Sequence, residues 1–217
     1  MSFTTSEENY IKSIYHLQQG TGLVNTNSVA AEMNTRPASV TDMLKKLKSK
    51  KLLQYEKYKG FKLSEAGKKA ALAVVRKHRL WEYFLVEHLK FDWDKVHPIA
   101  EELEHISSEE LVQRLDNFLG NPLFDPHGDP IPKSNGEIPT TVKTLLSEIE
   151  IGKSCRVVAV KDTSSVFLQY LEQLSVNIGT KIKVLDIVPF DNSMLLQIGK
   201  EIKTTVSKRF AESLLVD

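Results

Sequence analysis

Cysteine is almost absent from the sequence, which has only Cys155 among its 217 residues. A single thiol cannot form an internal disulfide or supply a thiolate-rich metal site, and such sparing use of cysteine is typical of a reducing compartment. The apolar runs are short, and none approaches the roughly 20 residues that a membrane-spanning helix needs. The N-terminal segment has no basic stretch followed by an apolar core, so we expect no signal peptide, no membrane partner and a cytoplasmic location.

A large net charge is also lacking, because the formal charge is only +1 at pH 7. The charged side chains are nevertheless unevenly distributed. Residues 36–62 contain nine Lys and Arg side chains but only two acidic ones, whereas residues 82–110 are rich in Asp and Glu and also contain histidines. This contrast between a basic segment and an acidic, histidine-containing one needs a functional explanation.

The first 63 residues have the pattern of a winged helix-turn-helix. The expected elements are a helix over 7–19, a short helix capped by Asn27-Ser28, a helix over 38–48 with Pro37 before it, and hairpin strands over 53–58 and 61–63. A helix, a short helix, a turn, a helix and a hairpin in this order are typical of a winged helix, which we assign to residues 1–72.

Two further domains are expected after the winged helix. Helical spacing recurs over 64–88, where we expect one interruption, and again over 96–106 and 110–119, so we assign a helical domain to residues 73–140. The end of this domain, 121–139, holds five of the eight prolines and is expected to be a linker. Short β-rich runs around a helix candidate then predict a small β-barrel over 150–217. The fold class is therefore mainly α with β.

The basic segment contains the helix that would read DNA. The second helix of a helix-turn-helix lies in the major groove, and its leading residues reach base edges. The candidate base contacts are Ala38, Ser39, Thr41, Asp42 and Lys45, and the candidate phosphate contacts are Arg36, Lys46, Lys48 and Lys59. A lysine-rich run alone is more often a solvated surface, and winged helices also bind proteins, so both alternatives stay open at this point.

Imidazole and carboxylate side chains recur at helical spacing in the acidic segment. They are His78 and Glu82 on one helix, and His97, Glu101, Glu104 and His105 on the next. If these helices pack together, the groups converge, and their charge is costly to bury unless a cation neutralises it. Either pair alone is more often a surface feature, but the six together favour a metal site. Nitrogen and oxygen donors without sulfur suit Mn(II) or Fe(II), and Zn(II), Co(II) and Ni(II) also bind such sites.

Six segments together resemble the diphtheria-toxin-repressor family of iron- and manganese-dependent transcriptional repressors, which includes the manganese transport regulators. They are SEENYIKSIYHL, RPASVTDMLKKL, YEKYKGFKLSEAGKKAA, RKHRLWEYFL, KVHPIAEELEHISSEEL and FDPHGDPIP, and they follow the family's order over essentially the whole chain. The resemblance implies a homodimer in which each chain has a winged helix, a helical dimerisation domain and a small barrel that is similar to an SH3 or FeoA domain. It also implies that metal binding favours the dimer that binds double-stranded operator DNA and represses genes for metal uptake.

The same resemblance assigns the metal ligands to two sites. It places His78, Glu82 and His97 in an ancillary site, with Asp162 of the barrel as the nearest candidate for an extra ligand. It places Glu101, Glu104 and His105 in a primary site that also takes a ligand from the first helix, at Asn9. The family usually has methionine or aspartate at that position, and an asparagine offers a carbonyl oxygen but no charge.

Three further positions follow from the resemblance. Glu101 replaces the cysteine of the iron-type members, and a hard carboxylate moves the preference toward manganese. Lys12 stands where some manganese regulators have an acidic ligand, which argues against their closely spaced two-metal arrangement. Among the candidate DNA contacts we also include Thr26, which lies where the family can have arginine, and Asn27.

Three functions remain open on the sequence alone. A metal-gated repressor is favoured, in which the metal sets the spacing of two recognition helices in a dimer. A winged-helix regulator with a vestigial metal site that senses another signal is the alternative. A metalloenzyme or storage protein is least favoured, because the HExxH pattern and a nucleophile arrangement are absent, and we do not expect an enzyme. Candidate dimer contacts are Trp81, Phe84, Leu85, Leu103, Leu111, Leu115 and Phe118, which could equally form the core of one chain.

Overall fold

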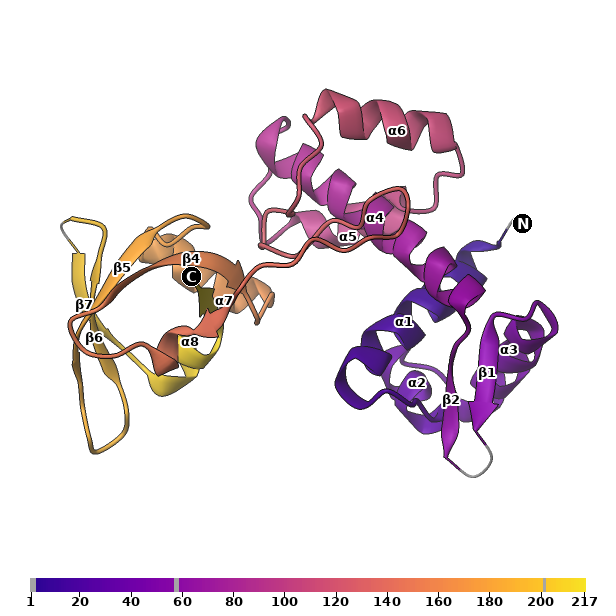
Figure 1. Cartoon of the computed structure of the whole chain (residues 1–217), viewed down its shortest axis with the longest axis horizontal. Helices are drawn as coiled ribbons and strands as arrows, with labels where there is room; N and C mark the ends of the chain where they lie inside the picture. The colour runs from indigo at the N-terminus through magenta and orange to yellow at the C-terminus, as the bar shows by residue number, and fades with distance from the viewer. Residues whose placement is uncertain (1–2, 57–58, 201) are drawn as a thin grey trace. The chain divides into compact units, whose positions relative to one another are not determined.

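The chain was analysed as a computed structural model, which describes residues 3–56, 59–200 and 202–217 (Figure 1). Two compact units are present. The first unit comprises Met1–His78, Glu101–Arg114 and Pro132–Ile138, and the second comprises Arg79–Ala100, Leu115–Ile131 and Pro139–Asp217. The division into domains at 1–72, 73–140 and 150–217 stays a prediction. Among the described residues, no helix is both long and apolar enough to cross a membrane.

The first unit contains the winged helix-turn-helix that the sequence predicts. Its elements are α1 (Thr5–Thr21), α2 (Thr26–Glu32), α3 (Pro37–Ser49), β1 (Leu53–Glu56) and β2 (Gly60–Leu63). The two strands form an antiparallel hairpin in which Leu53 is opposite Leu63. Figure 1 shows this hairpin beside the three helices. The predicted strand over 53–58 ends at Glu56, and its last two positions lie outside the described residues.

Helix caps set the start of the first two helices. Thr4 forms a capping box with Glu7, because the Thr4 hydroxyl accepts from the Glu7 N–H and the Glu7 carboxylate accepts from the Thr4 N–H. The predicted cap of the second helix is wrong. Asn25 caps α2, since its Oδ1 accepts from the Ser28 N–H at 2.9 Å, and Asn27 therefore lies inside the first turn.

The core of the winged helix joins α1 to the recognition helix. Ile11 and Ile14 of α1 are fully buried, and so are Val40 and Leu47 of α3. These residues repeat every three or four positions, which places them on one face of each helix. Phe61 of the hairpin is packed in the same core. A displacement of α1 would therefore disturb the packing of α3.

Three more helices follow, namely α4 (Glu65–Glu87), α5 (Val96–Leu103) and α6 (Glu109–Phe118). The expected interruption of the first of these is wrong, because α4 is one continuous helix. Its sequence has no proline, and its one glycine, Gly67, lies in the first turn, so no residue breaks it. The predicted cap of α6 is confirmed, since the Ser108 hydroxyl accepts from the Leu111 N–H at 3.2 Å.

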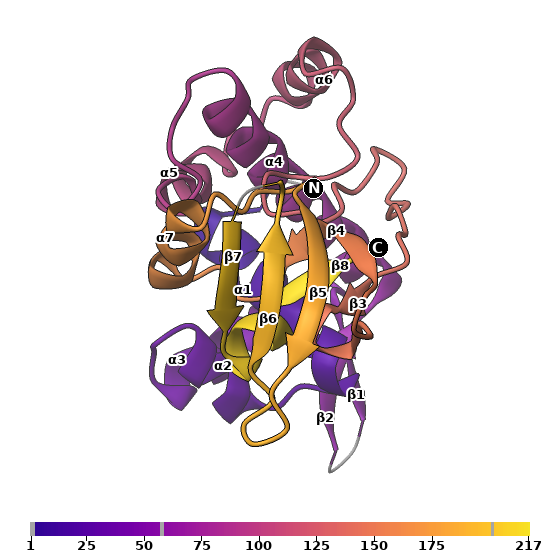
Figure 2. The same cartoon turned by 90° about the vertical axis from the view of Figure 1, so that its left-hand side faces the viewer.

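The C-terminal sheet belongs to the second unit and has six strands in the order β3-β8-β4-β5-β6-β7, all paired antiparallel. Its elements are β3 (Thr144–Leu145), the 3-10 helix η1 (Leu146–Glu148), β4 (Ser154–Val160), α7 (Ser165–Gln173), β5 (Lys181–Ile187), β6 (Met194–Ile198), β7 (Ile202–Val206), α8 (Lys208–Glu212) and β8 (Leu214–Val216). Figure 2 shows β5, β6 and β7 side by side. The predicted small β-domain with a helix near residues 165–174 is confirmed.

The segment 125–131 is hydrogen-bonded to this sheet. The Val160 N–H donates to the His127 carbonyl at 2.9 Å, and Trp93 lies in the apolar core of the sheet. Gly128 has a φ of +85°, and a Cβ at this position would lie 2.1 Å from the Val158 carbonyl oxygen. Only glycine tolerates both this backbone conformation and this close approach.

Gly128→Ala is therefore expected to destabilise the second unit much more than Gly152→Ala. Gly152 has nearly the same φ of +86°, but nothing lies within 4 Å of its added Cβ. We expect the free energy of unfolding to fall by about 1 kcal/mol for Gly152→Ala and by at least about 2 kcal/mol more for Gly128→Ala. Urea unfolding monitored by tryptophan fluorescence measures both, and equal losses would contradict the close approach.

Candidate metal centre and nucleic-acid interface

The leading face of α3 is solvent-exposed over its predicted DNA contacts. Ala38, Ser39, Thr41, Asp42, Lys45 and Lys46 are all exposed, as is Arg36 just before the helix. The Thr41 hydroxyl donates to the Pro37 carbonyl at 2.9 Å. Asp42 pairs with Lys45 at 3.0 Å, which offsets the acidic charge that would otherwise repel phosphates. The apolar residues of the helix face the core, so this polar surface is free for a groove of DNA.

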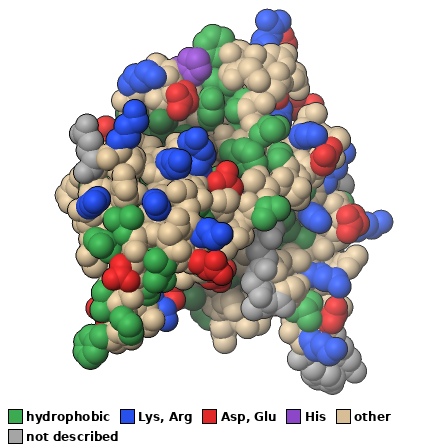
Figure 3. Space-filling model, turned by 60° about the vertical axis from the view of Figure 1, so that its left-hand side comes forward, with side chains coloured by type: hydrophobic (Ala, Val, Ile, Leu, Met, Phe, Trp, Pro, Cys, Tyr) green, Lys and Arg blue, Asp and Glu red, His purple; other side chains and the backbone are tan. Residues whose placement is uncertain are grey.

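The other predicted DNA contacts lie on the surface of the same unit. Asn27 and Lys59 are exposed, and Thr26 is half-buried. Residues 25–28 line one shallow surface pocket, and Asn34, Thr35, Arg36 and Ser39 line another. Basic and acidic side chains are interspersed among the described residues on the face in Figure 3.

A first cluster of candidate ligands lies within the first unit. Glu101 and Glu104 both contact Lys12 of α1, whose Nζ lies 2.6 Å from an oxygen of each carboxylate. The Glu104 side chain is fully buried, and its Oε2 also lies 2.7 Å from His78 Nδ1. Burial alone would raise the pKa of Glu104, but hydrogen bonds from His78 and Lys12 hold the pKa below its usual value.

His105 is oriented toward the same cluster by Glu8. Its Nδ1 lies 2.6 Å from Glu8 Oε2, and a carboxylate can only accept, so Nδ1 carries the proton. In the neutral imidazole, Nε2 then has the lone pair, and it lies 3.7 Å from Glu104 Oε1. Lys77 Nζ lies 3.4 Å from Glu8 and adds a counter-charge. This is the second-layer arrangement that orients metal-ligating histidines.

Two buried oxygens bear on whether a metal fits this first cluster. Asn9 Oδ1 is buried and makes no hydrogen bond, and Glu104 Oε1 also makes none, although Lys12 is close to it. Buried polar atoms almost always have a partner, so Asn9 Oδ1 calls for a donor or a cation, whereas Glu104 Oε1 already has the Lys12 ammonium at 2.6 Å. The donor set of two carboxylates, one imidazole and one amide oxygen suits a hard or borderline divalent ion. The donor types therefore suit a metal, although among the described residues the ligand atoms of Glu101, Glu104 and His105 do not form a group within 4.8 Å of one another.

A second cluster lies within the second unit and includes two residues that the sequence analysis missed. Ligand atoms of Glu82, Asp125 and His127 lie within 4.8 Å of one another, and all three side chains are buried. His127 Nε2 lies 3.0 Å from the Trp93 carbonyl, which can only accept, so Nε2 carries a proton; Nδ1, which has the lone pair in the neutral imidazole, lies 3.8 Å from Glu82 Oε2. The segment FDPHGDPIP was placed in a linker and counted toward the family resemblance, but its Asp and His were not predicted as metal ligands.

The residues predicted for the ancillary site are divided between the two units. His78 belongs to the first unit and contacts Glu104, which we predicted for the primary site. Glu82 and His97 belong to the second unit, where His97 Nδ1 lies 3.3 Å from Glu82 Oε1. The His97 side chain is 65% exposed, so it reaches the cluster from the solvent side.

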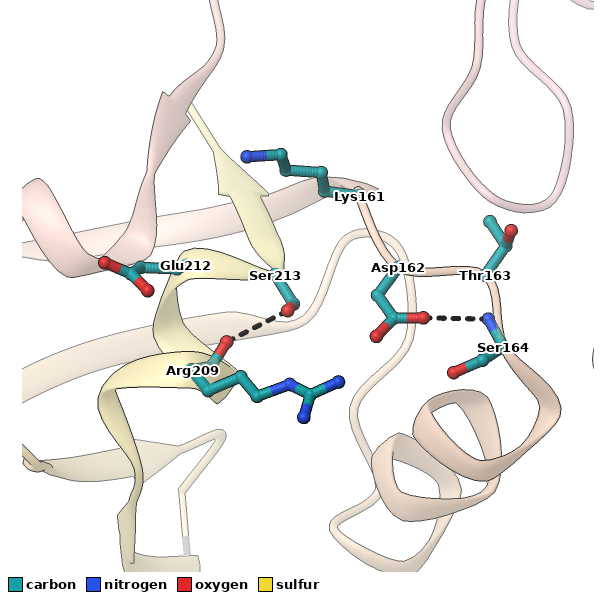
Figure 4. Close-up of a pocket in the computed structure, with 7 residues that line it drawn as sticks. All are labelled: Lys161, Asp162, Thr163, Ser164, Arg209, Glu212 and Ser213. Carbon is teal, nitrogen blue, oxygen red and sulfur yellow. Dashed lines mark hydrogen bonds between the residues drawn. The ribbon is translucent and has the colours of Figure 1, made fainter. Parts of the chain in front are cut away.

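Asp162 lies at a surface pocket of about 510 Å³ in the second unit (Figure 4). Its Oδ1 accepts from the Ser164 N–H at 3.0 Å, and the pKa of the carboxyl group is lowered by hydrogen bonding from the Ser164 side chain and then from this N–H. Lys161 and Arg209 line the same pocket. Among the described residues, the group of Glu82, Asp125 and His127 does not include Asp162. Its assignment as an extra ligand stays a prediction.

Comparisons with known proteins agree with this arrangement. Residues 2–61 match the N-terminal DNA-binding domain of iron-dependent repressors, residues 64–133 match their metal-binding and dimerisation domain, and residues 144–217 match the FeoA domain. The iron-dependent repressor IdeR of Mycobacterium tuberculosis is 33% identical over 125 residues, which are 58% of this chain and 54% of that protein. The chain thus spans about half the length of this relative.

Two other relatives are matched over more of their length. The transcriptional regulator MntR of Oceanobacillus iheyensis is 34% identical over 54% of this chain and 78% of its own. The structure of a manganese-dependent transcriptional repressor in complex with manganese has a TM-score of 0.83 and 30% identity, and the match covers 97% of this chain and 98% of that one. The chain therefore belongs to the diphtheria-toxin-repressor family of iron- and manganese-dependent transcriptional repressors.

Asp125 is expected to make stability depend on pH. Burial, and then the charges of Glu82 and Asp129, raise its pKa from 3.8 to about 7, although Arg79 and His127 oppose this shift. The folded chain then binds a proton that the unfolded chain releases between about pH 4 and 7, so this contribution to stability is lost as the pH rises. The free energy of unfolding of metal-free Asp125→Asn, relative to that of the wild type, should therefore rise by roughly 1–4 kcal/mol between pH 5 and pH 8. Denaturant unfolding at both pH values measures this, and a constant difference would contradict it.

Proposed function

We propose that this chain is a metal-dependent DNA-binding repressor in which a divalent ion is held by Asn9, Glu101, Glu104 and His105. The observation that carries the proposal is the fully buried Glu104 carboxylate, on which Lys12 and His78 converge and beside which His105 Nε2 lies at 3.7 Å. When bound, the ion supplies positive charge and a fixed coordination geometry rather than a reaction. The proposal assigns no catalytic role, and the relatives named above are transcriptional regulators.

The metal is proposed to be Mn(II) or Fe(II), with Zn(II), Co(II) or Ni(II) as possible substitutes in vitro. Oxygen and nitrogen ligands without thiolate suit Mn(II) and Fe(II). The manganese-dependent repressor named above has been solved with manganese, and another relative, ScaR, has been solved with bound Cd²⁺ and with bound Zn²⁺. We propose the second cluster, Glu82, Asp125 and His127, as the further metal site, with His97 at its solvent side.

Helix α1 is the proposed link between metal and DNA. Glu7, which is almost fully buried, pairs with Lys50 at the C-cap of α3 at 2.7 Å. Five residues further along α1, Lys12 contacts Glu101 and Glu104. A metal that ties Asn9 to these acids fixes α1, and α1 shares its core with the recognition helix. The ion thereby favours one placement of α3, and linkage requires DNA to tighten metal binding by the same factor.

The partners in this proposal are double-stranded operator DNA and a second copy of the chain. Phe84, His88 and Phe118 form an aromatic cluster in the second unit, and Phe118 is 65% exposed. Leu111 is also exposed, whereas Leu85 and Leu115 are buried within the chain. We propose that the exposed members contribute to a homodimer. The proposed site of action is the cytoplasm, where bacterial DNA lies.

Glu104→Gln is expected to abolish the metal response. An operator would first be selected from a random DNA library in the presence of Mn(II). We expect Mn(II) to raise the operator affinity of the wild type by roughly 5- to 150-fold and to leave that of Glu104→Gln unchanged. Glu110→Gln is the matched control, because Glu110 is 75% exposed and pairs with Arg114 at the surface. Fluorescence anisotropy with and without chelator measures these affinities. If the wild type bound the operator equally well with and without chelator, the result would favour a regulator whose metal site is vestigial.

Lys46→Ala is expected to weaken DNA binding at all sequences alike. Lys46 is exposed on α3, and the loss of one phosphate contact should reduce the slope of log affinity against log salt by about 1. Lys208→Ala, which removes a side chain that is 53% exposed on α8 of the other unit, should leave the slope unchanged. An unaltered slope for Lys46→Ala would show that this side chain does not contact phosphate.

A further inference from the structure

Lys12 lies between Glu101 and Glu104 in the first cluster. Its Nζ lies 2.6 Å from Glu101 Oε1, 2.6 Å from Glu104 Oε1 and 2.8 Å from Glu104 Oε2. The Lys12 side chain is only 12% exposed, and that of Glu104 is fully buried. An ammonium group in such a place neutralises carboxylates that could not be buried as free anions. Lys12 therefore supplies positive charge to both Glu101 and Glu104 in the metal-free chain.

A divalent ion needs the same oxygens that Lys12 contacts. Glu101 and Glu104 supply both negative charges of the proposed ligand set, since Asn9 and a neutral His105 contribute none. With Lys12 in place the three groups sum to −1, and without its charge they sum to −2. The charge available to an incoming cation is thus halved by a side chain that is fixed to α1, one turn from Asn9.

We propose that Lys12 is an internal competitor that sets the metal concentration at which the chain responds. A divalent ion bound by the carboxylate oxygens would replace the Lys12 ammonium, which would keep its proton and move toward solvent. One positive group is exchanged for another, and no covalent bond is made or broken. This inference rests on the proposed metal site. Lys12 raises the threshold for metal and also keeps α1 attached to residues 101–104 until metal arrives.

The competition predicts tighter metal binding when the charge of Lys12 is removed. We expect Lys12→Gln to lower the dissociation constant for Mn(II) by at least about tenfold at fixed pH, as measured by competition with a fluorescent chelator. Lys12→Arg keeps the charge and should bind Mn(II) no more tightly than the wild type. Lys50→Gln is the matched control, because Lys50 also pairs with a buried glutamate of α1 but does not contact Glu101 or Glu104.

Thermal unfolding supplies a second readout that does not depend on DNA. Metal-free Lys12→Gln should unfold at a lower temperature than the wild type, because Glu104 loses its counter-ion, and Mn(II) should raise its Tm by more than that of the wild type. If the amide prevents folding of the metal-free chain, Lys12→Met removes the same charge with a side chain better suited to partial burial, and the same two measurements apply.

The outcomes separate this inference from the proposed function. Wild-type binding of Mn(II) that Glu104→Gln abolishes and Lys12→Gln tightens supports both. Wild-type binding that Glu104→Gln abolishes but Lys12→Gln leaves equal or weakens overturns the competitor role and keeps the metal site. Binding that is insensitive to Glu104→Gln, or no binding by wild type and Lys12→Gln alike, overturns the site and the inference together. Equal tightening in Lys50→Gln or Lys12→Arg would also overturn the competitor role.

Discussion

The fully buried carboxylate of Glu104 is the constraint on which the first unit depends. A charge with no exposure to water is costly unless neighbouring groups compensate it. Here His78 of α4 and Lys12 of α1 both reach Glu104, so three segments that are distant in the sequence meet at one group. The same α1 shares an apolar core with the recognition helix α3. Whatever cation compensates Glu104 therefore also influences how the DNA-reading surface is held.

The sequence predicts those parts of the molecule that follow from periodicity. Apolar residues at helical spacing identify α1 and α3, and a change to short strands beside Lys59-Gly60 identifies the hairpin. The spacing of Glu101, Glu104 and His105 places three donors in one short segment, but the predicted helix over 96–106 is too long, because α5 ends at Leu103 and Glu104 and His105 lie in the turn that follows. Local capping is harder to predict, because Asn25, Asn27 and Ser28 are all good cap residues and only the backbone geometry selects Asn25.

Contacts across long sequence separations could not be predicted in this way. Lys12 and Glu104 are 92 positions apart, and nothing in the spacing of either segment indicates that they pair. Asp125 and His127 lie in a segment without helical or strand periodicity. Their side chains are fixed by backbone bonds, in which Asp125 Oδ1 accepts from the His127 and Asp129 N–H groups, and by the close approach of Gly128 to β4. A proline-rich sequence shows that such a loop exists but not which of its polar residues face inward.

The two clusters compensate their carboxylates by different means. In the first, a lysine supplies the positive charge and the pKa of Glu104 is lowered. In the second, Asp125 lies among Glu82 and Asp129, and Arg79 and His127 do not offset its burial, so its pKa is raised. A divalent ion entering the first cluster must exchange with an ammonium group, whereas one entering the second must displace a proton from Asp125. Metal binding at the first cluster would thus be opposed by the charge of Lys12, which belongs to the chain itself. Metal binding at the second cluster would be opposed by protons from the solvent and would therefore depend on pH.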